Sequence, residues 1–331
     1  MLHRWASLTG SSLCLLLAAG TGAFAQEHDF ATLNTELSTL NSAINNRGAK
    51  WVAAETSLSQ LSREDFQKRV GTSELKIDAK PMALLVLDAP PPQSLDWRDN
   101  NGRFVTAVKD QQKCGACWAF AMTGALESYM IRTGQTPTLD LSLSEQVLVS
   151  CDKQNDGCNG GHLDPDYLVK WGLPSTNEYP YTSGNGQPGT CPSSWPNFNA
   201  HKIGSWGSVP NNVDDIKAAL AAYGPLPSTL VVYEDFKHYK SGVYSYVSGF
   251  RLGTHAVLIV GFDDNGQYFI VKNSWGKDWG EKGYFRIAYS EIDGQSRFGL
   301  STIAFGKSGP NYDTIYTGMA DPAKFSGRSN P

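Results

Sequence analysis

The hydrophobic positions of the chain follow a helical period near the N-terminus. Apolar residues recur there at steps of three and four, which is the stripe of an amphipathic helix, at Phe30, Leu33, Leu37, Leu40 and Ile44. A second short helix is expected after Ser62, whose hydroxyl is a good N-terminal cap, and Gly71 can end it. The pattern therefore predicts a small helical module before the main part of the chain.

The main part of the chain, from Leu95 to about Phe305, changes from helical to strand patterns along its length. Residues 263–266, Asp-Asp-Asn-Gly, form a turn of hairpin type between the first two expected strands. The expected helices are 117–132, 144–149 and 213–223, and the expected strands are 255–262, 268–275 and 283–289. Helices that come first and paired strands that come later are typical of an α+β architecture, here with two lobes.

The first residues of the chain do not fit either pattern. His3 and Arg4 precede a short apolar run, Leu13 to Ala19, and Ala23-Phe24-Ala25 is a small-x-small sequence of the kind that signal peptidases cleave. A membrane anchor is the alternative, but the run is far short of the ~20 residues needed to span a bilayer. We therefore expect a signal peptide over residues 1–25 and a mature protein that is secreted or periplasmic, where disulfides can form.

Two further boundaries follow from composition. Ala89-Pro90-Pro91-Pro92 is a stiff, extended joint, and the residues from Lys307 onward are rich in Gly, Ser, Pro and Asp. We expect the helical module over 26–92, the main domain over 93–306 and a flexible tail over 307–331.

Net charge narrows the choice of partners. The chain of 331 residues carries a net charge of −4, with 18% charged residues of both signs interspersed. Neither nucleic acid nor an anionic membrane is therefore indicated as a partner.

The cysteines indicate that one thiol stays outside the disulfides. Cys14 would leave with the signal peptide, so five remain, at Cys114, Cys117, Cys151, Cys158 and Cys191. An odd number in an exported protein leaves at least one thiol without a disulfide partner in the chain. The closely spaced pair in Cys114-Gly-Ala-Cys117 has three interpretations: a redox dithiol, half of a zinc site, or one structural and one reactive cysteine.

The third interpretation, one structural and one reactive cysteine, explains why an odd number of cysteines remains. A redox pair usually follows a strand in a βαβ pattern, which is missing here, and an oxidising compartment favours disulfides over a zinc site. Cys117 would begin the helix 117–132, whose N-terminus stabilises a thiolate. A nucleophilic thiol also needs an imidazole and a group that orients it. The histidines of the main domain are His162, His201, His238 and His255.

Hairpin pairing favours the last of these histidines. His255 begins one expected strand and Asn273 ends the strand paired with it. The pairing can bring the two ends together, so that the amide fixes the tautomer of the imidazole.

The stretch QQKCGACWAF resembles the active-site sequence of the papain family of cysteine peptidases, whose signature is C-G-[SA]-C-[WY] with His and Asn far downstream. Four more blocks match in the family's order: SLSEQVLVSC (142–151), GCNGG (157–161), THAVLIVGF (254–262) and KNSWGKDWGEKGYFRI (272–287). The resemblance implies a papain-like fold, with a helical left lobe and a β-barrel-like right lobe on either side of the active-site cleft.

The resemblance also implies roles for individual residues. Cys117 matches the nucleophile, His255 the proton-shuttling imidazole, Asn273 the group that holds it, and Gln111 the side chain that completes the oxyanion hole. Residues assigned to the cleft are Gly160, Gly161, His162, Leu163, Trp275 and Ile303, among which Trp275 matches an indole that shields the Asn–His hydrogen bond. The implied disulfides are Cys114–Cys158 and Cys151–Cys191. One departure is that Gln112 stands where a glycine is usual.

The N-terminal module resembles the short propeptide of cathepsin B. The match covers residues 44–72 and includes Asn-Arg, Trp51-x-Ala53 and the Gly71 ending. An independent targeting or chaperone domain is the alternative. The resemblance implies that residues 26–92 inhibit the peptidase until they are removed.

Taken together, these features predict a secreted cysteine endopeptidase that is made as a zymogen. We expect protein or peptide substrates, the chain's own propeptide as inhibitor, no metal or organic cofactor, and a monomer. By comparison with cathepsin B, no histidine-bearing insertion between Pro188 and Trp206 caps the cleft, so we expect an endopeptidase. The resemblance places Ile303 at the floor of the specificity pocket, where it offers no charge partner, so we expect an apolar preference two residues before the scissile bond. A papain-like binding or matrix protein without catalysis and a thiol oxidoreductase are the rival interpretations.

Overall fold

The computed structural model describes residues 21–71, 90–134, 140–195 and 199–306. Its α-helices are α1 (Thr21–Arg47), α2 (Arg63–Gln67), α3 (Cys117–Arg132), α4 (Glu145–Cys151), α5 (Pro165–Lys170) and α6 (Val213–Tyr223). Its strands are β1 (Lys50–Ala53), β2 (Ser94–Asp96), β3 (Ser205–Val209), β4 (Leu226–Tyr233), β5 (Tyr239–Tyr244), β6 (Arg251–Asp263), β7 (Tyr268–Lys272), β8 (Tyr284–Ala288) and β9 (Thr302–Gly306). None of the helices within these ranges is both long and apolar enough to cross a membrane. The predicted signal peptide falls largely, and the predicted tail wholly, outside the described residues.

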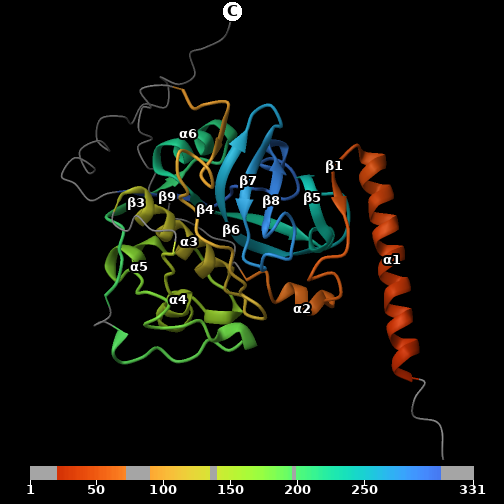
Figure 1. Cartoon of the computed structure of the whole chain (residues 1–331), viewed down its shortest axis with the longest axis horizontal. Coiled ribbons are helices and arrows are strands. Elements are labelled where there is room, and N and C mark those ends of the chain that lie inside the picture. The colour runs from red at the N-terminus through yellow and green to blue at the C-terminus, as the bar shows by residue number, and fades with distance from the viewer. Residues whose placement is uncertain (1–20, 72–89, 135–139, 196–198, 307–331) are drawn as a thin grey trace, which may run out of the picture.

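Helix α3 forms the centre of the molecule, between a region of helices and a region of strands (Figure 1). Every residue from Cys117 to Ile131 is buried, as expected for a helix that is covered on all sides. A Cβ added at Gly124 would lie 3.3 Å from a methyl group of Leu258 in β6, so the missing side chain lets the helix and the sheet approach closely. The predicted α+β arrangement in two lobes is confirmed.

Local sequence signals explain where the shorter helices begin. The Ser144 hydroxyl caps α4 by accepting the N–H of Val147, and the Ser62 hydroxyl caps α2 by accepting the N–H of Asp65. Helix α2 ends at Gln67, four residues before Gly71. The expectation that Gly71 ends this helix is therefore wrong, and the position of this glycine has another cause, described below.

The strands form a sheet in the order β1-β5-β8-β7-β6-β2, with β4 also paired to β6, and a separate pair β3-β9. The expected hairpin is present, because β6 and β7 run antiparallel from the Asp263–Tyr268 pair to the Leu258–Lys272 pair. Large aromatic side chains, among them Phe236, Trp279 and Phe285, are fully buried in this lobe. Their mutual edge-on contacts, with ring centroids 5.0–5.9 Å apart, give the sheet a rigid core.

The N-terminal module lies along the right lobe and extends its sheet. Strand β1 pairs antiparallel with β5, and α1 packs outside β1 at the edge of the molecule (Figure 1). Leu33, Leu40 and Ile44 are buried on the inner face of α1. From Leu33 to Ile44 the predicted amphipathic stripe is therefore the face that α1 turns toward the rest of the protein, and the side chain of Phe30 lies outside the described ones.

Candidate active site

Two disulfides shape the left wall of the site. They join Cys114 to Cys158 and Cys151 to Cys191, which is the pairing that the resemblance implies. Cys117 is in neither disulfide and keeps its thiol. It is the first residue of the 16-residue helix α3 and is fully buried. The thiol therefore lies at the positive end of a long helix dipole.

The β6–β7 hairpin brings His255 and Asn273 together. Asn273 directly follows β7, and its Oδ1 lies 2.8 Å from Nε2 of His255. The same Oδ1 accepts the backbone N–H of Ser274 at 2.8 Å, which fixes it as the oxygen of the amide. Nε2 of His255 must therefore carry the hydrogen of this bond. The other ring nitrogen, Nδ1, is buried and has no hydrogen-bond partner among the described residues.

Trp275 covers the His–Asn pair. Its indole stacks on the imidazole of His255 with ring centroids 4.5 Å apart, and the Trp275 side chain is fully buried. Phe66, from helix α2 of the N-terminal module, packs edge-on against this indole at 5.3 Å. A hydrogen bond kept away from water in this way is stronger than an exposed one.

Gln111 is held in a fixed orientation beside the cysteine. Its Oε1 accepts a hydrogen bond of 2.6 Å from the hydroxyl of Ser274, and its Nε2 donates to the carbonyl of Cys114 at 2.7 Å. Nε2 also donates to the carbonyl of Arg69 at 3.1 Å. The next residue, Gln112, has a φ of 54°, the region that favours glycine, in keeping with the glycine that is usual there.

The N-terminal module passes through the glycine-lined cleft after α2. The carbonyl of Gly71 accepts the N–H of Gly161 at 2.8 Å. A Cβ at Gly71 would lie 2.1 Å from the carbonyl oxygen of Gly115, and one at Gly160 would lie 2.6 Å from the carbonyl oxygen of Gly71. Glycine is therefore required at position 71 because two backbones meet there without room for a side chain.

The remaining residues assigned to the cleft are His162, Leu163 and Ile303. His162 follows Gly161, and its backbone N–H donates to the side chain of Asn155 at 2.6 Å. Leu163 is buried. Ile303 is fully buried in β9 opposite Ser208 of β3, and its assignment to the floor of the specificity pocket stays a prediction.

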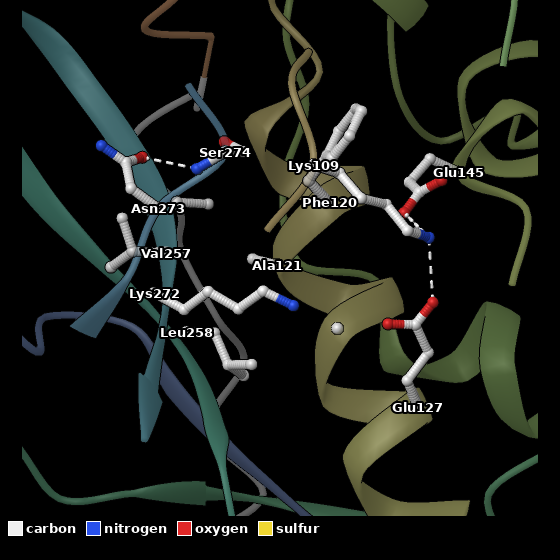
Figure 2. A pocket seen from close by; sticks show the side chains of 12 residues that line it. Lys109, Phe120, Ala121, Glu127, Glu145, Val257, Leu258, Lys272, Asn273 and Ser274 are labelled. Carbon is white, nitrogen blue, oxygen red and sulfur yellow. Dashed lines mark hydrogen bonds and ion pairs between the residues drawn. The ribbon is translucent and has the colours of Figure 1, made fainter. Parts of the chain in front are cut away.

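Both lobes line one small cavity behind the site. Phe120 and Ala121, one turn beyond Cys117, share it with Ala256, the neighbour of His255, and with Asn273 and Ser274 (Figure 2). The start of α3 and the end of the hairpin are therefore next to each other.

Sequence reasoning missed two features of this site. One is Ser274, which orients both Gln111 and Asn273. The other is a cluster of charged side chains around the cavity, from Lys109, Glu127, Glu145 and Lys272. Ser274 and Lys272 both lie in the matched block KNSWGKDWGEKGYFRI. Their positions on either side of Asn273 are the sequence signal that could have identified them.

Comparison with known proteins identifies the family. The model of the papain family of cysteine proteases matches residues 91–302. The chain belongs to this family and is a cysteine protease.

The relatives and solved structures include precursor forms. The chain is 38% identical over 213 residues to "Cathepsin B-like CP1" of Giardia intestinalis, covering 61% of this chain and 69% of that protein. It is 40% identical over 205 residues to "Cysteine proteinase B" of Leishmania mexicana, covering 59% of this chain but only 44% of that protein. The structure of procathepsin B S9 from Trypanosoma congolense superposes with a TM-score of 0.74 at 25% identity, over 83% of this chain and 98% of the other.

Proposed function

We propose that the chain is an exported cysteine endopeptidase made as a zymogen, with Cys117 as nucleophile, His255 as proton carrier and Asn273 as the group that orients the imidazole. The observation that carries this proposal is the Nε2–Oδ1 hydrogen bond of 2.8 Å, with Oδ1 itself fixed by the N–H of Ser274. With Nε2 engaged in this way, Nδ1 is the nitrogen that can exchange a proton with the thiol.

The reaction then follows from the positions of Cys117 and His255. The Cys117 thiolate attacks the carbonyl carbon of a peptide, forming a C–S bond while the carbonyl oxygen becomes an oxyanion. Nε2 of Gln111 and the N–H of Cys117 donate hydrogen bonds to this oxyanion. The tetrahedral carbon expels the amine, which takes the proton from Nδ1 of His255. A water molecule then gives a proton back to Nδ1 and cleaves the thioester, releasing the acid.

The N-terminal module accounts for latency in this proposal. The carbonyl of Arg69 occupies the Nε2 donor of Gln111, and the carbonyl of Gly71 occupies the N–H of Gly161. A substrate needs the same donors, so residues 26–92 act as the inhibitory propeptide of a peptidase domain that spans residues 93–306. The two disulfides are consistent with an exported protein.

The cleft favours endopeptidase activity with an apolar preference. His201, the histidine between Pro188 and Trp206, is bonded through its backbone to Leu173 in the left lobe, with distances of 2.8 and 2.9 Å. Its backbone is therefore part of the left lobe, and we propose that it does not capture the C-terminal carboxylate of a substrate. With Ile303 at the pocket floor, a buried arginine of the substrate would have no partner, and burying an unpaired charge costs more than an apolar side chain gains. Peptide-library profiling tests both points: removal of C-terminal dipeptides alone, or a preference for arginine over leucine, would contradict them.

Thiol titration tests the catalytic assignment. The matured protein is treated with increasing amounts of an epoxide thiol reagent while hydrolysis of a peptide amide is followed, and the labelled residue is mapped. We expect activity to fall in proportion to label on Cys117, and Cys117→Ala to be inactive with both disulfides intact. Labelled protein that never hydrolysed the amide would favour a binding protein, and a Cys114–Cys117 disulfide would favour an oxidoreductase.

A further inference from the structure

Three buried charged side chains, Glu127, Glu145 and Lys272, meet the half-buried Lys109 between the two lobes. Lys109 lies between two carboxylates, with its Nζ 2.9 Å from Glu127 and 2.6 Å from Glu145 (Figure 2). Lys272 points toward this group from the opposite lobe and is buried. Burying charges is costly unless they are paired and hydrogen-bonded, so a cluster of two lysines and two glutamates at this place needs an explanation.

A hydroxyl joins Lys272 to the rest of the cluster. Nζ of Lys272 donates to Oγ1 of Thr106 at 3.1 Å, and the Thr106 hydroxyl donates to Oε2 of Glu127. Glu127 is on α3, the helix that begins with Cys117, and its Oε1 also accepts the N–H of Leu143 at 2.9 Å. Lys272, Thr106 and Glu127 therefore form a hydrogen-bonded relay. It runs from the last residue of β7 to α3, the helix that carries the thiol.

The position of Lys272 in the sequence links this relay to the reaction. Asn273, the next residue, bonds to His255, and Ser274, the one after, bonds to Gln111. A shift at the end of β7 would move both bonds relative to α3. The cavity of about 20 Å³ between these groups, roughly the size of one water molecule, leaves little room for such a shift in the intact relay.

We propose that Lys272 is a positioning residue, whose ammonium group, through Thr106 and Glu127, ties β7 to α3 and so holds His255, Asn273 and Gln111 in register with Cys117. This inference rests on the proposed function of the site. Lys272 touches no reacting atom and acts through the residues that follow it.

The charge state of Lys272 gives the relay a pH limit. Burial lowers the pKa of this lysine to about 8, although Glu127 partly offsets the effect and Lys109 adds to it. Lys109 remains charged because Glu145 and Glu127 outweigh its burial and raise its pKa. The relay is therefore complete below about pH 8 and loses its ammonium group above that pH.

Replacement of Lys272 by methionine tests the proposal. We expect Lys272→Met to lower kcat roughly 10- to 100-fold, the scale of a small misplacement of reacting groups, with KM changed less than about twofold because the cleft is untouched. Lys240→Met, at an exposed position of β5, is the control and should keep wild-type kinetics. Unchanged kcat in folded Lys272→Met would overturn the proposal.

Thr106 supplies a second test if Lys272→Met fails to fold. Thr106→Val removes the bridging hydroxyl at constant volume, whereas Thr106→Ser keeps it. We expect Thr106→Val to lower kcat and to move the alkaline fall of kcat to lower pH, because Lys272 loses the hydrogen bond that favours its charged form, and Thr106→Ser to restore both. A Val variant with wild-type kcat and pH profile refutes the positioning role. Absence of activity in the wild-type enzyme would instead refute the proposed function.

Discussion

Trp51 is the residue on which latency should depend most strongly. It is the second residue of β1 and only 3% of it is exposed. Its indole lies 5.2 Å from the ring of Tyr244 and 6.2 Å from that of Tyr239, and its Nε1 donates to the carbonyl of Ser245 at 3.0 Å. Opposite it stands Gly242, where a Cβ would come within 2.6 Å of the Trp51 Cα. The right lobe thus encloses the Trp51 side chain, and the glycine at position 242 lets the two strands approach closely.

The size of the effect follows from this burial. Replacing a buried tryptophan by alanine costs about 3–5 kcal/mol, because both the transferred area and the cavity left behind contribute. If the segment 26–92 is added in trans, the substitution weakens only the complex, because the contacts of Trp51 join the segment to the enzyme. Each 1.4 kcal/mol is a factor of ten in a dissociation constant, so Trp51→Ala should raise the inhibition constant of the segment roughly 10²- to 4 × 10³-fold.

The assay is inhibition of the matured enzyme by the isolated segment, measured from the steady-state rate of hydrolysis of a peptide amide. Val52→Ala is the matched control, since Val52 is the next residue of the same strand, points away from the sheet contact and is 52% exposed. We expect this control to change the inhibition constant less than about threefold. Equal effects of the two substitutions would refute the reasoning, because they would mean that β1 is not seated on β5 in the inhibited complex.

Three further predictions concern pH and the orienting side chains. Burial lowers the pKa of His238, and the hydrogen bond from His238 lowers that of Glu36 although burial opposes it. The complex of segment and enzyme therefore binds fewer protons than the two separated partners, so inhibition in trans should weaken as the pH falls below the ordinary pKa values of these groups, about 6.5 and 4.3, and Glu36→Gln should flatten the lower part of this dependence. Asn273→Ala should lower kcat about 10- to 100-fold without abolishing activity, since it removes a hydrogen bond to a group that becomes charged. Ser274→Ala, which frees the Gln111 amide, should lower kcat roughly 2- to 10-fold with little change in KM.

Much of the main domain could be predicted because its signals are local. The bounds of α3 and α6 agree with the sequence expectation, since apolar periodicity and the following Gly134 and Gly224 mark them. The proximity of His255 and Asn273 could also be predicted, because a short turn fixes the register of a hairpin and so brings its two outer ends together.

Contacts between distant segments could not be predicted from local patterns. Strand β1 has only four residues, and its partner β5 begins almost two hundred positions later. Nothing near Lys272 in the sequence shows that a carboxylate from α3 and a hydroxyl from the preceding loop will surround it. Gly71 was misinterpreted for the same reason, because the backbone that excludes a side chain there belongs to Gly115.

The division of contacts along the N-terminal module suggests where its inhibitory selectivity comes from. The hydrogen bonds to Gln111 and Gly161 are made by backbone atoms, namely the carbonyls of Arg69 and Gly71. Backbone contacts of this kind are open to any peptide, so they cannot distinguish an inhibitor from a substrate. The contacts that depend on side chains are different: Phe66 packs on Trp275, the Arg69 guanidinium lies 3.5 Å from Asp110, and Trp51 is buried against the right lobe away from the catalytic residues. A chain that lacks these side chains would keep only the backbone bonds that any peptide can make, so the proposed inhibitor differs from a substrate chiefly in its side-chain contacts.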